Sequence, residues 1–149
     1  MAKSPSVREF MIEHPYTIKF TDTVSVAEKV MQVHRIRHLP VVECKKVVGI
    51  ISDRDIMVAK NVFKNKLIEG RVLVQDICLS EPCTVEESTS MEKVAREMSR
   101  NRWDAVVVVK DDIPVGIFTT VDACRLLAER FHGIQKPVGF FEALRRRLA

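Results

Sequence analysis

The sequence lacks any long hydrophobic run. Nothing in its 149 residues approaches 18 consecutive apolar positions, so a membrane-spanning helix is not expected. The N-terminal stretch MAKSPSVREF (1–10) also lacks the apolar core of a secretory signal peptide. These two absences predict a cytoplasmic protein with no membrane partner.

Closely spaced cysteines are absent as well. The four cysteines are Cys44, Cys78, Cys83 and Cys124, and no two of them have C-x-x-C spacing. Zinc sites usually need closely spaced ligand pairs, and the four histidines do not supply them. We therefore expect free thiols, buried or incidental, and no metal site.

No catalytic constellation is recognisable. No serine or cysteine lies in a nucleophile motif, and the paired acids are Asp53 with Asp55 and Asp111 with Asp112. The second pair lies in KDDIP (110–114), which predicts a hairpin turn. An enzyme is therefore not expected.

The composition is that of a globular protein, with 46% hydrophobic and 30% charged residues. The formal net charge of +4 suits an anionic ligand or partner. Nucleic acid is not expected as a partner, because no base-stacking surface or recognition helix is apparent.

An internal repeat organises most of the chain. Residues 7–60 align with residues 74–127 without a gap, at an offset of 67 residues. The clearest recurrence is GIISDRDIM (49–57), which returns as GIFTTVDAC (116–124). Pro15 matches Pro82 and Asp55 matches Asp122 at the same offset. The sequence therefore predicts a duplicated structural unit.

Each copy predicts the order β-α-β-β-α. A short strand at 17–18 or 84–85 precedes a helix in TVSVAEKVMQVHR (23–35) or STSMEKVAREMSRN (88–101). Two apolar strands joined by a short polar turn follow, and a second helix ends the unit. In the first helix we expect Thr23 or Ser25 as the cap, and Val26, Val30 and Val33 lie at helical spacing.

Neither copy encloses enough core to stand alone, since about 55 residues bury too little apolar surface. We therefore expect an α/β (α+β) fold in which two β-α-β-β-α repeats pack sheet to sheet with pseudo-twofold symmetry. The predicted division is 7–66 for the first repeat, 67–132 for the second and 133–149 for a C-terminal helical tail.

The predicted tail carries an apolar stripe. Phe140, Phe141, Leu144 and Leu148 lie at helical spacing after Pro137, and three arginines lie near the end of the stretch. We expect a helix that packs on the domain or on a dimer partner. A helix that binds a membrane surface or another protein is the alternative.

Two explanations fit the repeated phrase. Ser52 or Thr119, with an acid three residues later, is close to a helix capping box. The same groups also suit a nucleotide, because a helix N-terminus with a hydroxyl binds phosphate and a carboxylate can accept hydrogen bonds from ribose hydroxyls. Gly49 and Gly116 on the preceding strands would then leave room for the sugar.

The order of elements, with RHLPVV before VVGIISDRDI (47–56) and the phrase given twice, resembles a tandem pair of cystathionine beta-synthase (CBS) domains over roughly residues 7–131. Both copies match the family motif Gly-hydrophobic-x-Thr/Ser-x-x-Asp/Asn. The resemblance implies a stand-alone regulatory module, forming a homodimer, that binds AMP, ADP, ATP or S-adenosylmethionine between its repeats. A shape change would then pass the signal to a protein partner.

The resemblance also implies the binding residues. In the first repeat these are Thr17, Arg37, His38, Ile50, Ser52, Asp53, Arg54 and Asp55. In the second they are Thr84, Asp104, Ala105, Ile117, Thr119, Thr120 and Asp122.

The two copies differ in charge. The first carries Arg37, His38 and Arg54, where the second has Asp104, Ala105 and Val121. We therefore expect the first phrase to bind phosphate better. Which cleft receives the basic side chains stays open, because both repeats contribute to each cleft. A structural or protein-interaction module, with the phrase serving only as a cap, is the alternative function.

Overall fold

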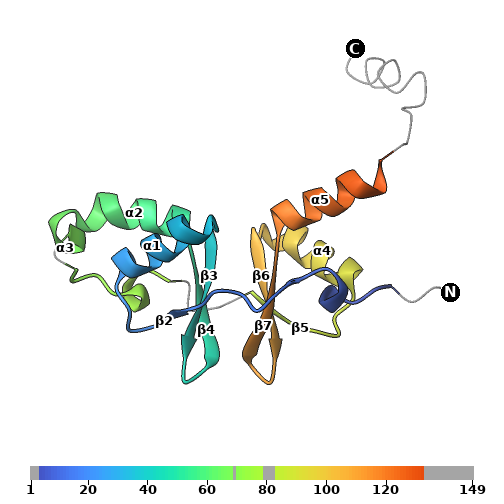
Figure 1. Cartoon of the computed structure of the whole chain (residues 1–149), viewed down its shortest axis with the longest axis horizontal. Helices are drawn as coiled ribbons and strands as arrows, with labels where there is room; N and C mark the ends of the chain where they lie inside the picture. The colour runs from blue at the N-terminus through green and yellow to red at the C-terminus, as the bar shows by residue number, and fades with distance from the viewer. Residues whose placement is uncertain (1–3, 69, 79–82, 133–149) are drawn as a thin grey trace, which may run out of the picture.

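Two similar halves lie side by side, with two β-hairpins back to back at the centre (Figure 1). The computed structural model describes residues 4–68, 70–78 and 83–132. Helices cover the outer side of each hairpin (Figure 1). The predicted tail, residues 133–149, lies outside the described residues.

The first repeat has the predicted β-α-β-β-α order. Its elements are β2 (Ile18–Lys19), α1 (Val24–His34), β3 (His38–Glu43), β4 (Lys46–Ser52), α2 (Asp53–Phe63) and a short α3 (Asn65–Ile68). In its sheet β2 runs parallel to β3, and β3 pairs antiparallel with β4. Cys44 and Lys45 connect β3 and β4 with φ angles of 49° and 67°, as a two-residue type I′ hairpin turn requires.

The second repeat has the same order. Its elements are β5 (Thr84–Glu86), α4 (Met91–Asn101), β6 (Ala105–Lys110), β7 (Ile113–Thr119) and α5 (Thr120–Arg130). Asp111 and Asp112 make its hairpin turn with φ angles of 53° and 65°, which confirms the turn predicted in KDDIP. The pseudo-symmetric α/β fold is thereby confirmed.

The repeats exchange their N-terminal segments. A 3-10 turn (Val7–Glu9) and β1 (Ile12–Glu13) pack on the second repeat, where β1 pairs with β7. The corresponding turn (Val74–Asp76) packs on the first repeat. Val7 and Val74, 67 residues apart, are both fully buried in the core of the other repeat. Each half in space therefore combines parts of both predicted ranges, 7–66 and 67–132.

Helix α1 begins at the predicted cap and buries one face against the sheet. Thr23 caps it, with Oγ1 accepting a hydrogen bond from the Val26 N–H at 3.3 Å. The buried side chains are those of Val24, Ala27 and Met31, at i, i+3 and i+7. Val26 and Val33 lie in the helix as their spacing predicts, but both are exposed.

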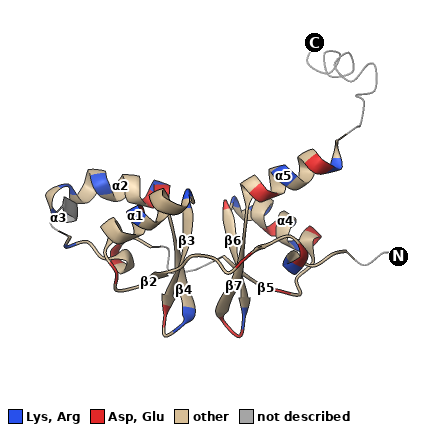
Figure 2. Cartoon of the chain, in the orientation of Figure 1, with Lys and Arg blue, Asp and Glu red and all other residues tan. Residues whose placement is uncertain are grey.

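A third buried cluster joins the two sheets. It consists of Ile50 of β4 with Ala105, Val107 and Val109 of β6 and Ile117 of β7. At the hairpin tips, the Val47 N–H donates to the carbonyl of Asp112 at 2.9 Å, and Lys46 Nζ lies 3.3 Å from Asp112 Oδ2 (Figure 2). This cluster confirms the predicted sheet-to-sheet packing.

All four cysteines are free. Cys44 and Cys124 are exposed, whereas Cys78 and Cys83 are half-buried. Burial raises the pKa of the Cys78 and Cys83 thiols, so both stay protonated at neutral pH.

Among the described helices, none has the length and apolar character needed to cross a bilayer.

Candidate functional site: a basic cleft between the repeats

A cleft of about 540 Å³ opens between the two repeats, where α5 begins opposite the end of α1. We call it the basic cleft. Its side chains come from the β1–β2 segment, the α1–β3 connection, α2 and the β7–α5 junction. The lining residues are Ile12, Glu13, His14, Pro15, Tyr16, Arg35, Ile36, Arg37, His38, Arg54, Asp104, Ile117, Thr119, Thr120, Val121, Asp122 and Arg125.

The second copy of the repeated phrase forms one wall of this cleft. Thr119 is the N-cap of α5, and Asp122 Oδ2 accepts hydrogen bonds from its N–H at 2.9 Å and its hydroxyl at 2.7 Å. Thr119 Oγ1 in turn accepts from the Asp122 N–H at 3.4 Å. The Asp122 side chain is buried, and Oδ1 accepts from Arg125 Nη1 at 3.2 Å. The capping role is therefore fulfilled in full, and it fixes the carboxylate at the cleft.

The first copy has the same local geometry. Asp55 Oδ2 accepts from the Ser52 N–H at 2.7 Å and from the Ser52 hydroxyl at 2.8 Å. By the repeat offset, residues 79–82 correspond to 12–15, which line the basic cleft; residues 79–82 lie outside the described residues.

The basic side chains of the first repeat line the cleft of the second motif. Arg35 ends α1 in a left-handed conformation (φ 53°), Arg37 and His38 lead into β3, and Arg54 lies in the first turn of α2. The structure therefore differs from the expectation that these groups favour the first phrase. The cause is the pseudo-twofold arrangement, which sets the start of β3 and α2 in one repeat across from the start of α5 in the other.

Three ion pairs control the charge at this site. Arg54 Nη1 lies 3.6 Å from Asp104 Oδ2, and this pair crosses from one repeat to the other. Arg37 Nε lies 2.9 Å from Asp53 Oδ2. Asp104 lines the cleft, where its carboxylate would repel an anion, but Arg54 opposes its charge. The third pair is Arg125 with Asp122.

His38 is held in its neutral form. Burial lowers the pKa of its imidazole, and the charge of Arg37 lowers it further. The carboxylates of Asp104, Asp53 and Asp55 act in the opposite direction but do not reverse the shift. At neutral pH this imidazole therefore offers one donor and one acceptor to a ligand.

The segment between β1 and β2 closes one side of the cleft. His14, Pro15 and Tyr16 line it, and the Tyr16 ring stacks on that of His34 with ring centroids 3.7 Å apart and planes at 18°. Sequence reasoning missed this segment, together with Arg35, Ile36 and Arg125. No local signal in the sequence shows this, because it is the exchange of N-terminal segments that carries residues 12–16 across the cleft.

The structure brings eight of the predicted site residues together in the basic cleft: Arg37, His38, Arg54, Asp104, Ile117, Thr119, Thr120 and Asp122. The others lie elsewhere. Ile50, Ser52 and Asp55 form the first motif, and Ala105 is buried between the sheets. Asp53 faces Arg37. Thr17, just before β2, and Thr84, the first residue of β5, are both exposed.

Gly116 does not leave room for a sugar. A Cβ at this position would lie 2.2 Å from Met11 Sδ, so the methionine already fills the space beside the glycine. Gly116 instead allows the Met11 side chain of the N-terminal segment to approach the β7 backbone closely.

No cluster of three His, Cys, Asp or Glu side chains suited to a metal ion occurs in residues 4–68, 70–78 and 83–132.

A comparison with protein-family models finds the CBS domain twice, over residues 7–61 and 74–129. The chain belongs to the CBS domain family. Two curated relatives are enzymes. The chain is 32% identical over 124 residues to inosine-5′-monophosphate dehydrogenase of Korarchaeum cryptofilum, and 34% identical over 128 residues to L-aspartate semialdehyde sulfurtransferase of Methanocaldococcus jannaschii. These alignments cover 82% and 83% of the chain but only 24% of each relative.

Solved structures of CBS proteins share the fold. The AcuB protein of Vibrio cholerae, assigned to acetoin utilization, superposes with a TM-score of 0.79 at 25% identity, covering 88% of this chain and 97% of that one. The CBS domain pair of protein MJ0100, in complex with 5′-methylthioadenosine and S-adenosyl-L-methionine, gives 0.75 at 29% identity over 86% and 99% of the two chains.

Proposed function

We propose that this CBS pair is a regulatory module that binds an adenosine-containing ligand bearing phosphate, such as AMP, ADP or ATP, in the basic cleft. The observation that carries the proposal is the placement of the buried Asp122 carboxylate opposite Arg37, His38 and Arg54. In this view the module regulates a partner and catalyses no reaction itself.

The two ends of the cleft suit the two ends of a nucleotide. Asp122, held by Thr119 and Arg125, presents a carboxylate able to accept hydrogen bonds from ribose hydroxyls. The guanidinium groups of Arg37 and Arg54 suit phosphate oxygens, which they can bind in bidentate fashion. A volume of about 540 Å³ lies within the usual range of small-molecule sites.

The MJ0100 pair supports the adenosine part of the proposal, since that protein was solved with two adenosine-containing ligands. S-adenosylmethionine shares the adenosine part with these nucleotides and is therefore included among the ligands to be tested. The arginines of the basic cleft favour phosphate over the sulfonium group, which carries a positive charge.

A ligand phosphate in this cleft would compete with Asp104 for Arg54. Because that ion pair crosses between the repeats, occupancy would change a contact that sets their relative position. We propose that this change is what a protein partner detects.

We further propose a homodimer, formed through the exposed apolar side chains of the outer helices. Met57, Val58 and Val62 of α2 and Val121 of α5 are large, apolar and exposed.

Isothermal titration calorimetry with AMP, ATP, S-adenosylmethionine and adenosine tests the ligand. We expect AMP and ATP to bind more tightly than adenosine. Asp122→Asn should abolish binding in the basic cleft. The matched variant Asp55→Asn changes the same capping box in the first motif and should leave this binding intact, with both variants losing about 1 kcal/mol of stability.

The alternative is a structural or protein-interaction module that binds no nucleotide. It is favoured by one observation, that both capping boxes are complete without a ligand. A folded sample that gives no heat with any of the four compounds would exclude the sensor and leave this alternative.

A further inference from the structure

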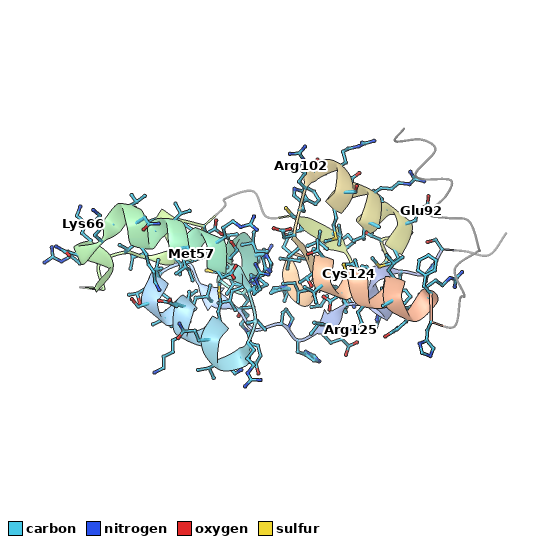
Figure 3. All side chains as sticks on the ribbon, turned by 90° about the horizontal axis from the view of Figure 1, so that it is seen from above. Met57, Lys66, Glu92, Arg102, Cys124 and Arg125 are labelled. Atoms are coloured by element: carbon cyan, nitrogen blue, oxygen red, sulfur yellow. The ribbon has the colours of Figure 1, made fainter. Side chains whose placement is uncertain are left out.

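An apolar groove of about 830 Å³ runs between α4 and α5, on the second repeat. The two helices lie side by side and antiparallel when the molecule is seen from above (Figure 3). Among the lining residues are Phe10, Met98, Trp103, Ala123, Leu126 and Leu127. Leu127 is 57% exposed, so apolar surface of this groove faces solvent in the described structure.

The corresponding groove of the first repeat is only about 390 Å³. Met31, Ile36 and Ile56, the counterparts of Met98, Trp103 and Ala123, line it. Two features close it further along: Lys60 forms an ion pair with Glu28 across the helices, and α3 packs on α1. The counterparts of Lys60 and Glu28 are Leu127 and Ala95, both apolar and both on the open groove.

We propose that the segment 137–148 of the same chain fills the α4–α5 groove as a helix. The internal symmetry supports this occupant. At the repeat offset, α3 (Asn65–Ile68) corresponds to residues 132–135, so the chain that follows α5 begins where α3 packs back on α1 in the first repeat. The apolar stripe of Phe140, Phe141, Leu144 and Leu148 matches the apolar lining.

The lengths agree. Residues 133–136 can span up to about 13 Å, enough to reverse direction at the end of α5. A helix over 137–148 would be about 18 Å long, against about 16 Å for the eleven residues of α5.

A short connection makes this helix antiparallel to α5. Arg145 to Arg147 then come near Asp104 and Thr120, the two residues shared by the groove and the basic cleft.

The single tryptophan, Trp103, reports on the groove. In the full chain, the double variant Phe140→Ser with Leu144→Ser should increase acrylamide quenching of Trp103 and move its emission to longer wavelength. The matched double variant Glu142→Gln with Arg146→Gln, on the opposite face of the predicted helix, should change neither. Equal quenching in the wild type and both variants would overturn the proposal.

A second experiment acts on the groove instead of the tail. Leu127→Glu should release the segment and speed tryptic cleavage at Arg145 to Arg147, followed by mass spectrometry. Val33→Glu is the control, since Val33 is 65% exposed on α1, away from the groove and from the proposed dimer surface. Unchanged cleavage with a lower oligomeric mass in Leu127→Glu would assign the groove to a second copy and refute the proposal. If the protection of Arg145 to Arg147 against trypsin is lost when the wild-type protein is diluted, a second copy holds the segment, and the proposal that it binds its own chain is refuted.

Discussion

At the scale of single residues, the protonation of His38 in the cleft makes the stability of the protein depend on pH. It lies at the start of β3, paired in register with Ser52 of the first motif, and it lines the cleft of the second. Burial is the main cause of its lowered pKa, and the carboxylates of Asp104, Asp53 and Asp55 offset only part of the shift. The folded protein therefore binds a proton at this imidazole less readily than the unfolded chain.

This difference predicts a loss of stability in acid. Between the lowered folded pKa and the ordinary value of 6.5, the unfolded chain holds the proton and the folded protein does not. The contribution of His38 is thus fully present above pH 6.5 and is lost as pH falls through the folded pKa. Urea denaturation at a series of pH values should show the free energy of unfolding decreasing over that window.

The substitution His38→Asn should remove most of this slope, because asparagine does not titrate. An unaltered slope in His38→Asn would show that other groups produce the acid sensitivity.

At the scale of elements, β1 depends on one glycine of β7. Ile12 pairs with Ile117 and Glu13 with Gly116, and the Met11 side chain occupies the space where a Cβ of residue 116 would lie. This contact fastens the N-terminal segment to the second repeat, and the same segment forms one side of the basic cleft.

We expect Gly116→Ala to destabilise the protein by about 1 kcal/mol, the lower end of the effect of inserting a carbon into a packed site, because the nearest atoms belong to the flexible Met11 side chain, which can shift. Met11→Ala should recover part of that loss when the two changes are combined, since it removes the sulfur and Cγ atoms nearest the new Cβ. A double-mutant cycle by denaturation measures this coupling. Strictly additive effects would contradict the packing explanation.

The elements themselves were largely predictable from the sequence. Both hairpin turns and the Thr23 cap follow from the residue types at those positions. The repeat follows from the second occurrence of the same pattern in the chain. The buried face of α1 did not follow, because apolar residues at 24, 26, 27, 30, 31 and 33 allow more than one phase of the helical period. Burial of Val24 and Ala27 is decided by the sheet beneath them.

The site was predictable in its residues but not in its assembly. The motif identified Thr119 and Asp122, yet nothing local in the sequence shows that Arg54 faces them from the other repeat. That pairing is a long-range consequence of the pseudo-twofold packing around Ile50, Val107 and Ile117. For the same reason residues 12–16 entered the cleft unforeseen.

At the scale of the whole molecule, two of the ion pairs among the described residues join the two halves in space. Lys46 and Asp112 meet at the hairpin tips, and Arg54 and Asp104 meet at the basic cleft. Both pairs are exposed, so each adds little to stability. Their difference is functional, since only the second pair lies where a ligand phosphate is proposed to bind.

Asp104→Asn should therefore strengthen the binding of AMP and ATP, because it removes a negative charge that competes for Arg54. The expected gain in affinity is about two- to fivefold, the range that exposed pairs of unit charges provide, and it should shrink as salt is added. Adenosine, which has no phosphate, should bind as it does to the wild type.

Asp112→Asn is the matched control: it removes the same charge from the other inter-repeat pair, away from the cleft. Calorimetric titrations of both variants separate a local effect on Arg54 from a general effect of net charge. If Asp112→Asn tightens AMP binding as much as Asp104→Asn does, the Arg54–Asp104 pair is not the contact through which the ligand acts on the relative position of the repeats.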